Sequence, residues 1–182
     1  MMARVIAVVG PSGVGKDTVI AALLRQSPRL QKWRRVITRP ESAGGEDFDG
    51  VDVAEFTRRA EAGEFELIWE AHGLRYGLPK GAHSTGRDLL VNLSRAQLSQ
   101  AHSKFGPALT VLSLTARPEI LAMRLQHRGR ETAADVAARL SRVAEIPPGI
   151  PCIEIANEGT IEETVISILA ALYPASGQRV IS

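Results

Sequence analysis

The sequence feature that most constrains the fold is a glycine-rich loop close to the start of the 182-residue chain. An apolar run, Val5 to Val9, leads into the pattern Gly10-x4-Gly15-Lys16, and apolar residues at helical spacing follow. Strand, glycine loop and helix in this order are the context of a phosphate-binding P-loop. Glycines let successive backbone N–H groups point into one hollow, and the first helical turn adds partial positive charge.

This loop predicts that the protein binds ATP. Lys16 is placed to reach the β- and γ-phosphates, and the alternative, a plain glycine turn, is disfavoured by the apolar strand before it and the helix after it. We expect the ATP-binding residues of the loop to be Gly10, Pro11, Ser12, Gly13, Val14, Gly15, Lys16, Asp17 and Thr18.

One position departs from the usual motif, because residue 17 is an aspartate and the hydroxyl is displaced to Thr18. Mg²⁺ loses its water reluctantly. We therefore expect Mg²⁺ to be held mainly by the nucleotide phosphates and by water, with Thr18 and Asp17 contributing through that water. Asp17 has a second interpretation that stays open, as an acidic residue favoured by the helix dipole.

Composition bounds the class of protein. The length suits one compact domain, and the net charge of +2 does not favour a nucleic-acid partner. No apolar run approaches the ~20 residues of a membrane span, and no signal peptide is recognisable, so we expect a soluble, cytoplasmic protein. The single cysteine, Cys152, excludes an intramolecular disulfide and is expected to be buried.

Alternating apolar segments predict an α/β fold of three layers with a mostly parallel sheet, whose ligands bind at the carboxyl ends of the strands. The predicted strands span residues 3–9, 34–38, 65–71, 74–78, 88–92, 108–114 and 151–156. The predicted helices span residues 15–27, 53–62, 95–104, 117–126, 133–145 and 161–173, and residues 41–52 are expected to form a loop.

We expect this fold to form one kinase-like domain over residues 1–174. Its predicted parts are a core (1–34 and 86–174), a partly β substrate-binding excursion (35–80), a lid (about 127–142) and a tail (175–182).

Two groups of polar residues are candidates for chemistry. The first is five arginines, which either form a lid over the triphosphate or line solvated helix faces. They are Arg124, Arg128, Arg130, Arg139 and Arg142. The second lies in the excursion, where arginine and tyrosine side chains suit a phosphate and acids suit sugar hydroxyls or metal-bound water; the alternative is an ordinary charged surface. Its candidates are Arg39, Glu46, Asp47, Glu70, Arg75 and Tyr76.

Motifs over residues 5–172 are similar to those of guanylate kinases. They are Thr38-Arg39-Pro40, Gly45-Glu46, Phe56, Gly63-x-Phe65, Trp69, Tyr76-Gly77, Arg124-Leu125-x-x-Arg128-Gly129, Arg139-Leu140 and Asn157. The resemblance implies a P-loop core with a substrate subdomain and a lid. It also implies that Arg128 and Arg139 are catalytic lid residues, alongside Lys16, and that Arg124 and Asn157 bind the nucleotide.

Departures from the guanylate kinase pattern disfavour a purine monophosphate. Ser42 stands where that family has a second arginine, and Asn92-Leu-Ser94-Arg95 replaces its acidic strand end. The variant motifs instead resemble the ribose 1,5-bisphosphate phosphokinases (PhnN) of bacterial phosphonate utilisation. This resemblance implies that ATP phosphorylates ribose 1,5-bisphosphate, a phosphosugar, to 5-phosphoribosyl 1-diphosphate (PRPP).

Three alternatives stay open: a guanylate kinase, another small-metabolite kinase, and a non-catalytic guanylate-kinase-like binding module. A binding module is disfavoured because Gly10, Gly15 and Lys16 are all present. A homodimer is one assembly open to such a chain.

Overall fold

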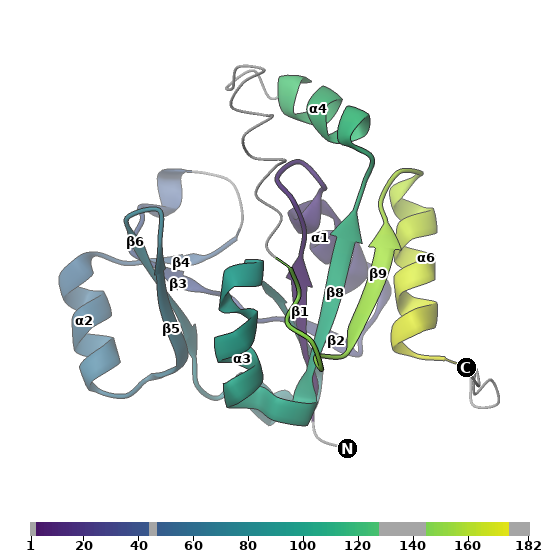
Figure 1. The fold of residues 1–182 in the computed structure, drawn as a ribbon. Coiled ribbons are helices and arrows are strands. Elements are labelled where there is room, and N and C mark those ends of the chain that lie inside the picture. The colour runs from purple at the N-terminus through teal and green to yellow at the C-terminus, as the bar shows by residue number, and fades with distance from the viewer. Residues whose placement is uncertain (1–2, 44–46, 128–144, 175–182) are drawn as a thin grey trace.

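A central sheet of five strands organises the computed structural model, which describes residues 3–43, 47–127 and 145–174 (Figure 1). Its strand order is β2-β7-β1-β8-β9, and every neighbouring pair is parallel. The strands are β1 (Val5–Val9), β2 (Leu30–Lys32), β7 (Asp88–Asn92), β8 (Leu109–Thr115) and β9 (Cys152–Ala156).

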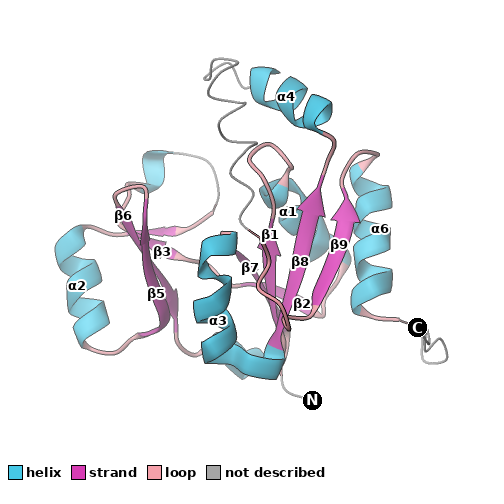
Figure 2. Ribbon diagram, in the orientation of Figure 1, coloured by secondary structure: helices cyan, strands magenta, loops and turns pink. Residues whose placement is uncertain are grey.

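Helices cover both faces of this sheet (Figure 2). Alternate residues of β1 point to opposite faces, so that Val5 and Ala7 pack on the side of α3, whereas Ile6 and Val8 pack on the side of α1 and α6. The predicted three-layer α/β fold with a parallel sheet is confirmed. The helices are α1 (Lys16–Gln26), α3 (Leu98–Phe105), α4 (Pro118–His127) and α6 (Ile161–Leu172).

A second, smaller sheet stands beside the central one (Figure 1). Its strand order is β4-β3-β6-β5. Helix α2 packs on one face through Phe56, whereas Leu67, Trp69 and Leu78 on the other face join the core of the central sheet. The elements are β3 (Val36–Ile37), β4 (Asp49–Gly50), α2 (Val53–Glu61), β5 (Phe65–Ala71) and β6 (Leu74–Pro79).

Some element predictions were wrong. The predicted strand 34–38 is the two-residue β3, β2 was missed, and the predicted loop 41–52 contains β4. Cys152 is exposed, because it lies on β9 at the edge of the sheet. The predicted helix 133–145 and most of the predicted lid lie outside the described residues. Four short 3₁₀ helices complete the described elements: Glu41–Ala43, Ala82–Thr85, Arg95–Gln97 and Gly106–Ala108.

No helix in the described part of the chain has both the length and the apolar character that a membrane crossing requires.

Candidate active site

The P-loop connects β1 to α1 at the carboxyl edge of the central sheet. Gly13 and Gly15 have φ of 84° and 93°, a left-handed conformation that side chains other than glycine rarely adopt. Gly15 is the N-cap of α1, and no described side chain caps this end of the helix. The first N–H groups of α1 are therefore positioned to bind an anion, as the sequence predicts.

Neighbouring elements pack closely against the loop and leave little room for a side chain at its glycines. A Cβ on Gly13 would lie 3.0 Å from Cγ of Leu125 in α4, and a Cβ on Gly15 would lie 3.0 Å from Nδ2 of Asn157. In Figure 1, α4 lies at the same end of the sheet as the loop.

Lys16 lies against the backbone of the loop that precedes it. Its Nζ donates to the carbonyl oxygen of Gly10 at 2.9 Å and to that of Pro11 at 3.4 Å. The ammonium group is thus held beside the hollow that its position in the motif predicts it to serve.

Asn157 braces the P-loop from inside the protein. Its side chain is buried; its Nδ2 donates to the Val14 carbonyl at 2.8 Å, and its Oδ1 accepts from Thr164 Oγ1 at 2.9 Å. Arg124 Nη1 donates to the same Val14 carbonyl at 3.4 Å. Both residues predicted to bind the nucleotide therefore contact the loop, and the amide groups of Asn157 are engaged within the protein.

Asp17 and Thr18 are exposed at the start of α1. The Asp17 carboxylate accepts a hydrogen bond from Asn92 Nδ2 at 3.0 Å, from the carboxyl end of β7. A carboxylate and a hydroxyl are oxygen donors of the kind that Mg²⁺ and its water shell prefer, so these residues fit the predicted role. Among the described residues no three His, Cys, Asp or Glu side chains gather as a metal site.

Tyr76 faces the central sheet, and its ring contacts Arg35, which is not among the residues predicted from the sequence. Its ring stacks on Trp69 with centroids 5.2 Å apart, and the Arg35 guanidinium lies 5.3 Å from the Tyr76 ring centroid. Burial lowers the pKa of Arg35, while the nearby Asp17 charge opposes that effect. The sequence feature that could have indicated Arg35 is the alternation of side chains along a strand. Arg35 lies two residues before Ile37, the β3 partner of Tyr76, so an extended chain places Arg35 and Ile37 on the same face.

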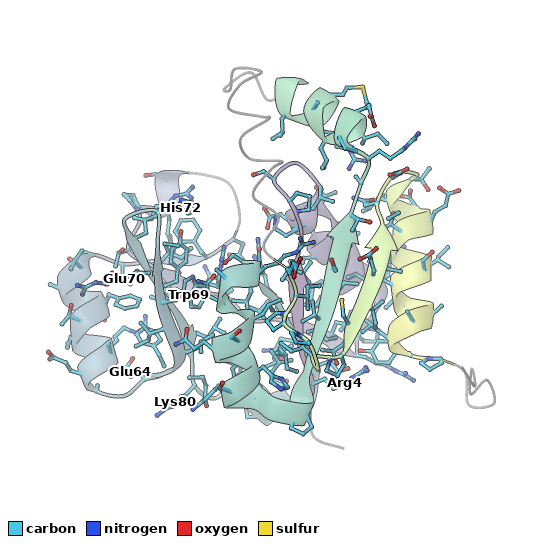
Figure 3. The ribbon with its side chains drawn as sticks, viewed as in Figure 1. Arg4, Glu64, Trp69, Glu70, His72 and Lys80 are labelled. Atoms are coloured by element: carbon cyan, nitrogen blue, oxygen red, sulfur yellow. The ribbon has the colours of Figure 1, made fainter. Side chains whose placement is uncertain are left out.

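Arg75 and Glu70, both predicted to bind substrate, lie on the opposite face of the small sheet from Tyr76. Arg75 Nε donates to Glu70 Oε1 at 3.1 Å, and its Nη1 donates to Thr57 Oγ1 of α2 at 3.1 Å. Figure 3 shows Glu70 toward α2 and Trp69 toward the central sheet. The physical reason is strand alternation, which sends neighbours such as Arg75 and Tyr76 to opposite faces.

The other predicted substrate residues have varied positions. The Arg39 guanidinium lies 5.1 Å from the ring centroid of Phe48. Asp47 is exposed and accepts from Arg34 Nε at 2.9 Å. Five further candidate residues lie outside the described ranges: Glu46, Arg128, Arg130, Arg139 and Arg142.

Arg95, which follows β7, contacts a strand of the central sheet. Arg95 Nη2 donates to Ser113 Oγ of β8 at 3.4 Å. The replacement of the acidic strand end by Asn92 and Arg95 therefore leaves an amide and a cation at this edge of the sheet.

Known proteins are similar to this chain in sequence and in fold. The sequence is 49% identical to a ribose 1,5-bisphosphate phosphokinase PhnN of Ruegeria sp. (strain TM1040) over 175 residues, which cover 92% of this chain and 90% of that protein. It is 43% identical to the protein of the same name from Pantoea vagans over 171 residues, covering 92% of this chain and 96% of that protein. No family model matches the sequence.

The fold is similar to that of guanylate kinase from Anaplasma phagocytophilum, with a TM-score of 0.68 and 22% identity over 96% of this chain and 88% of that one. At this identity the likeness concerns the fold. The close sequence relatives go further, and they show that the chain belongs to the ribose 1,5-bisphosphate phosphokinase (PhnN) family.

Proposed function

We propose that this protein transfers the γ-phosphoryl group of ATP to the 1-phosphate of ribose 1,5-bisphosphate, giving PRPP and ADP. The observation that carries the proposal is the P-loop, whose helix start has no described side-chain cap, together with the Arg35–Tyr76 pair at the small sheet, in a chain of this family. The site thus offers an anion-binding hollow for a donor and a cation for an anionic acceptor.

The reaction forms one bond and breaks one. An oxygen of the 1-phosphate attacks the γ-phosphorus of ATP, and the bond from that phosphorus to the bridging oxygen of ADP breaks. The second pKa of a phosphate ester is about 6, so the acceptor is already anionic at neutral pH and needs no strong general base. What it needs is in-line alignment and relief from charge repulsion.

The chain's own residues supply both. The backbone N–H groups of residues 12–17 hold the donor phosphates, and Lys16 neutralises charge on the β- and γ-phosphates. Arg39 and Tyr76 are proposed to bind the acceptor, and Asp47 and Glu46 to bind its sugar hydroxyls. Arg128 and Arg139 are proposed to neutralise the transferring group.

Mg²⁺ is proposed as the metal that accompanies ATP, where it would offset phosphate charge. Asp17 and Thr18 are the residues that would orient its water shell.

The test is phosphorus NMR of the purified protein with MgATP, with ribose 1,5-bisphosphate in one sample and GMP in another. The expected result is a new diphosphate signal of PRPP in the first sample only. Turnover of GMP alone would favour the guanylate kinase that the fold suggests, and would mean that the altered strand end at Asn92 still recognises guanine.

A further inference from the structure

We infer that Asn92 is a positioning residue for the magnesium of the donor nucleotide: it holds the Asp17 carboxylate beside the P-loop, where that carboxylate binds the water shell of Mg²⁺. This inference rests on the proposed function, in which Mg²⁺ accompanies ATP, and adds to it the residue that orients Asp17. It implies that the acidic and the uncharged side chain of a usual P-loop magnesium site have changed places in this chain.

The usual site takes two side chains from different segments. P-loop NTPases hold Mg²⁺ with the Ser or Thr that follows the P-loop lysine and with an aspartate from elsewhere in the chain. Here the residue that follows Lys16 is Asp17, and the strand end that is acidic in the guanylate kinase pattern carries Asn92. One carboxylate is therefore kept between the two positions, and it lies on the helix.

The pairing of β7 with β1 brings Asn92 to the P-loop. The two strands are parallel, and Asn92 pairs with Val8, two residues before the first glycine of the loop. Alternation along β7 directs Leu90 to the side of α1, whereas Leu89 and Val91 pack on the side of α3. Asn92, two residues after Leu90, therefore points to the side on which α1 begins.

A direct hydrogen bond joins the two side chains. Asn92 Nδ2 donates to Asp17 Oδ1 at 3.0 Å, across 75 residues of sequence. The contact ties the first turn of α1 to the carboxyl end of β7. Because a carboxylate has about four lone-pair sites and Asp17 is exposed, it can accept from Asn92 and from metal-bound water at once.

An amide suits position 92 because it donates without adding a second negative charge beside the nucleotide phosphates. An acidic side chain at a helix start can otherwise turn toward the N–H groups of its own helix. The bond to β7 opposes that rotation, and α1 begins without a described side-chain cap, so its first N–H groups stay available to phosphate. Of the two interpretations of Asp17, this contact favours the one that involves Mg²⁺.

The experiment measures how much Mg²⁺ tightens the binding of a non-hydrolysable ATP analogue. Calorimetry gives the dissociation constant of the analogue with Mg²⁺ and with excess EDTA, and the ratio of the two constants is the magnesium effect. Asp17→Asn should reduce this effect about 10-fold, as expected for lost charged hydrogen bonds. Asn92→Ala should reduce it about three- to fivefold, because the carboxylate remains but is no longer held.

A double variant separates positioning from independent roles. Asp17→Asn with Asn92→Ala should show the same magnesium effect as Asp17→Asn alone, because Asn92 acts through Asp17. If Asn92 only anchors α1 to β7, Asn92→Ala will weaken the analogue equally with Mg²⁺ and with EDTA. That result, or losses that add in the double variant, would overturn the inference.

Gln100→Ala is the matched control. It also removes an amide that joins two elements, since Gln100 Nε2 of α3 donates to the Ile68 carbonyl of β5 at 3.1 Å. This contact lies on the side of the central sheet opposite to α1, so the magnesium effect should equal that of the wild type.

Exchanging the two residues gives the sharpest result. Asp17→Asn combined with Asn92→Asp preserves the net charge and returns the carboxylate to the strand end. The magnesium effect should recover to within about threefold of wild type, because the acid and the amide still face each other across the same site. The exchange keeps both groups, so it decides the question if Asn92→Ala does not fold; an effect as low as that of Asp17→Asn alone would contradict the inference.

Turnover is scored separately, because the calorimetry uses no acceptor. If the variants behave as expected and PRPP does not form, the proposed reaction is wrong and the role of Asn92 stands. If PRPP forms and Asn92→Ala keeps the magnesium effect of the wild type, the proposed reaction stands and the role of Asn92 falls.

Discussion

At the scale of single residues, the lysine of the P-loop is held before any nucleotide arrives. Lys16 Nζ contacts the carbonyl oxygens of Gly10 and Pro11. Hydrogen bonds from an ammonium group to phosphate oxygens are stronger than those to neutral carbonyls, because both partners are charged. An incoming triphosphate can therefore exchange these contacts at a net gain.

Lys16→Ala should lower kcat by at least about 100-fold while the melting temperature changes little, because its main effect is on charge in the transition state. Steady-state kinetics and a thermal melt check this. Lys104→Ala is the control, since that lysine pairs with Glu66 on the side of α3 and should leave kcat unchanged. A near-normal kcat for Lys16→Ala would contradict the P-loop assignment.

At the scale of elements, Asn157 joins three segments that are distant in sequence. It follows β9, donates to Val14 in the loop after β1, and accepts from Thr164 in α6. A buried amide in such a position fixes the loop relative to the sheet and the helix, since leaving either partner unsatisfied costs free energy.

Asn157→Ala should lower the free energy of unfolding by about 2–3 kcal/mol and weaken ATP binding, because the loop loses its brace. Urea unfolding and ATP titration check this. Thr164→Val removes the hydrogen bonds from Thr164 Oγ1 to Asn157 Oδ1 and to the Thr160 carbonyl but keeps the contact of Asn157 with Val14, so it should have a smaller effect on both. If Asn157 instead contacts the base, the variant will change the preference between ATP and GTP with little loss of stability.

Strands were predictable where the pattern of apolar residues in the sequence matches the pattern of buried residues in the structure. The apolar run Val5–Val9 and the alternating segment Phe65–Ala71 predicted β1 and β5, because each burial pattern is complete within the strand. Strand β2 was missed since three residues carry no periodicity, and its register comes from β7. The faces of β6 were not predictable, because the choice between Arg75 and Tyr76 depends on pairing with β3 and on packing of α2.

At the scale of the whole molecule, one charged cluster fastens the sheet at the end remote from the P-loop. Asp88 accepts hydrogen bonds from Arg4 Nη2 at 2.7 Å and from the Tyr173 hydroxyl at 2.8 Å. Arg4 and Arg29 each lie 5.0 Å from the ring centroid of Tyr173. The cluster links the residue before β1, the first residue of β7 and the residue after α6, so it ties the beginning of the described chain to its end.

This cluster predicts a specific acid sensitivity. Burial alone would raise the pKa of Asp88, but hydrogen bonds from Arg4 and Tyr173 outweigh it and hold the pKa below its ordinary value. A depressed folded-state pKa gives stability that is present above the unfolded pKa of about 3.9 and is lost as pH falls through the folded pKa. The contribution of the cluster is therefore complete at neutral pH.

Asp88→Asn should lower the free energy of unfolding by about 1–3 kcal/mol at pH 7, and its deficit relative to wild type should shrink as the pH falls below about 4. Urea unfolding across this pH range measures the deficit. Glu61→Gln, an exposed change on α2, should show no such trend. A deficit that is constant with pH would mean that Asp88 acts by shape and not by charge.

The strand order has a consequence for how such a protein can change. Strands β2 and β7 are hydrogen-bonded neighbours, with Leu30 paired to Asp88, yet the whole small sheet lies between them in sequence. Because the two strands are parallel, the intervening segment leaves at the carboxyl end of β2, at Lys32, and re-enters at the amino end of β7, at Asp88. Lys32 pairs with Leu90, so the two ends are one strand spacing and two residue rises apart, roughly 8 Å. A segment whose ends lie this close can be replaced while the order and pairing of the central strands stay the same. The proposed acceptor-binding residues can therefore change in evolution while the P-loop and the strands around it are retained.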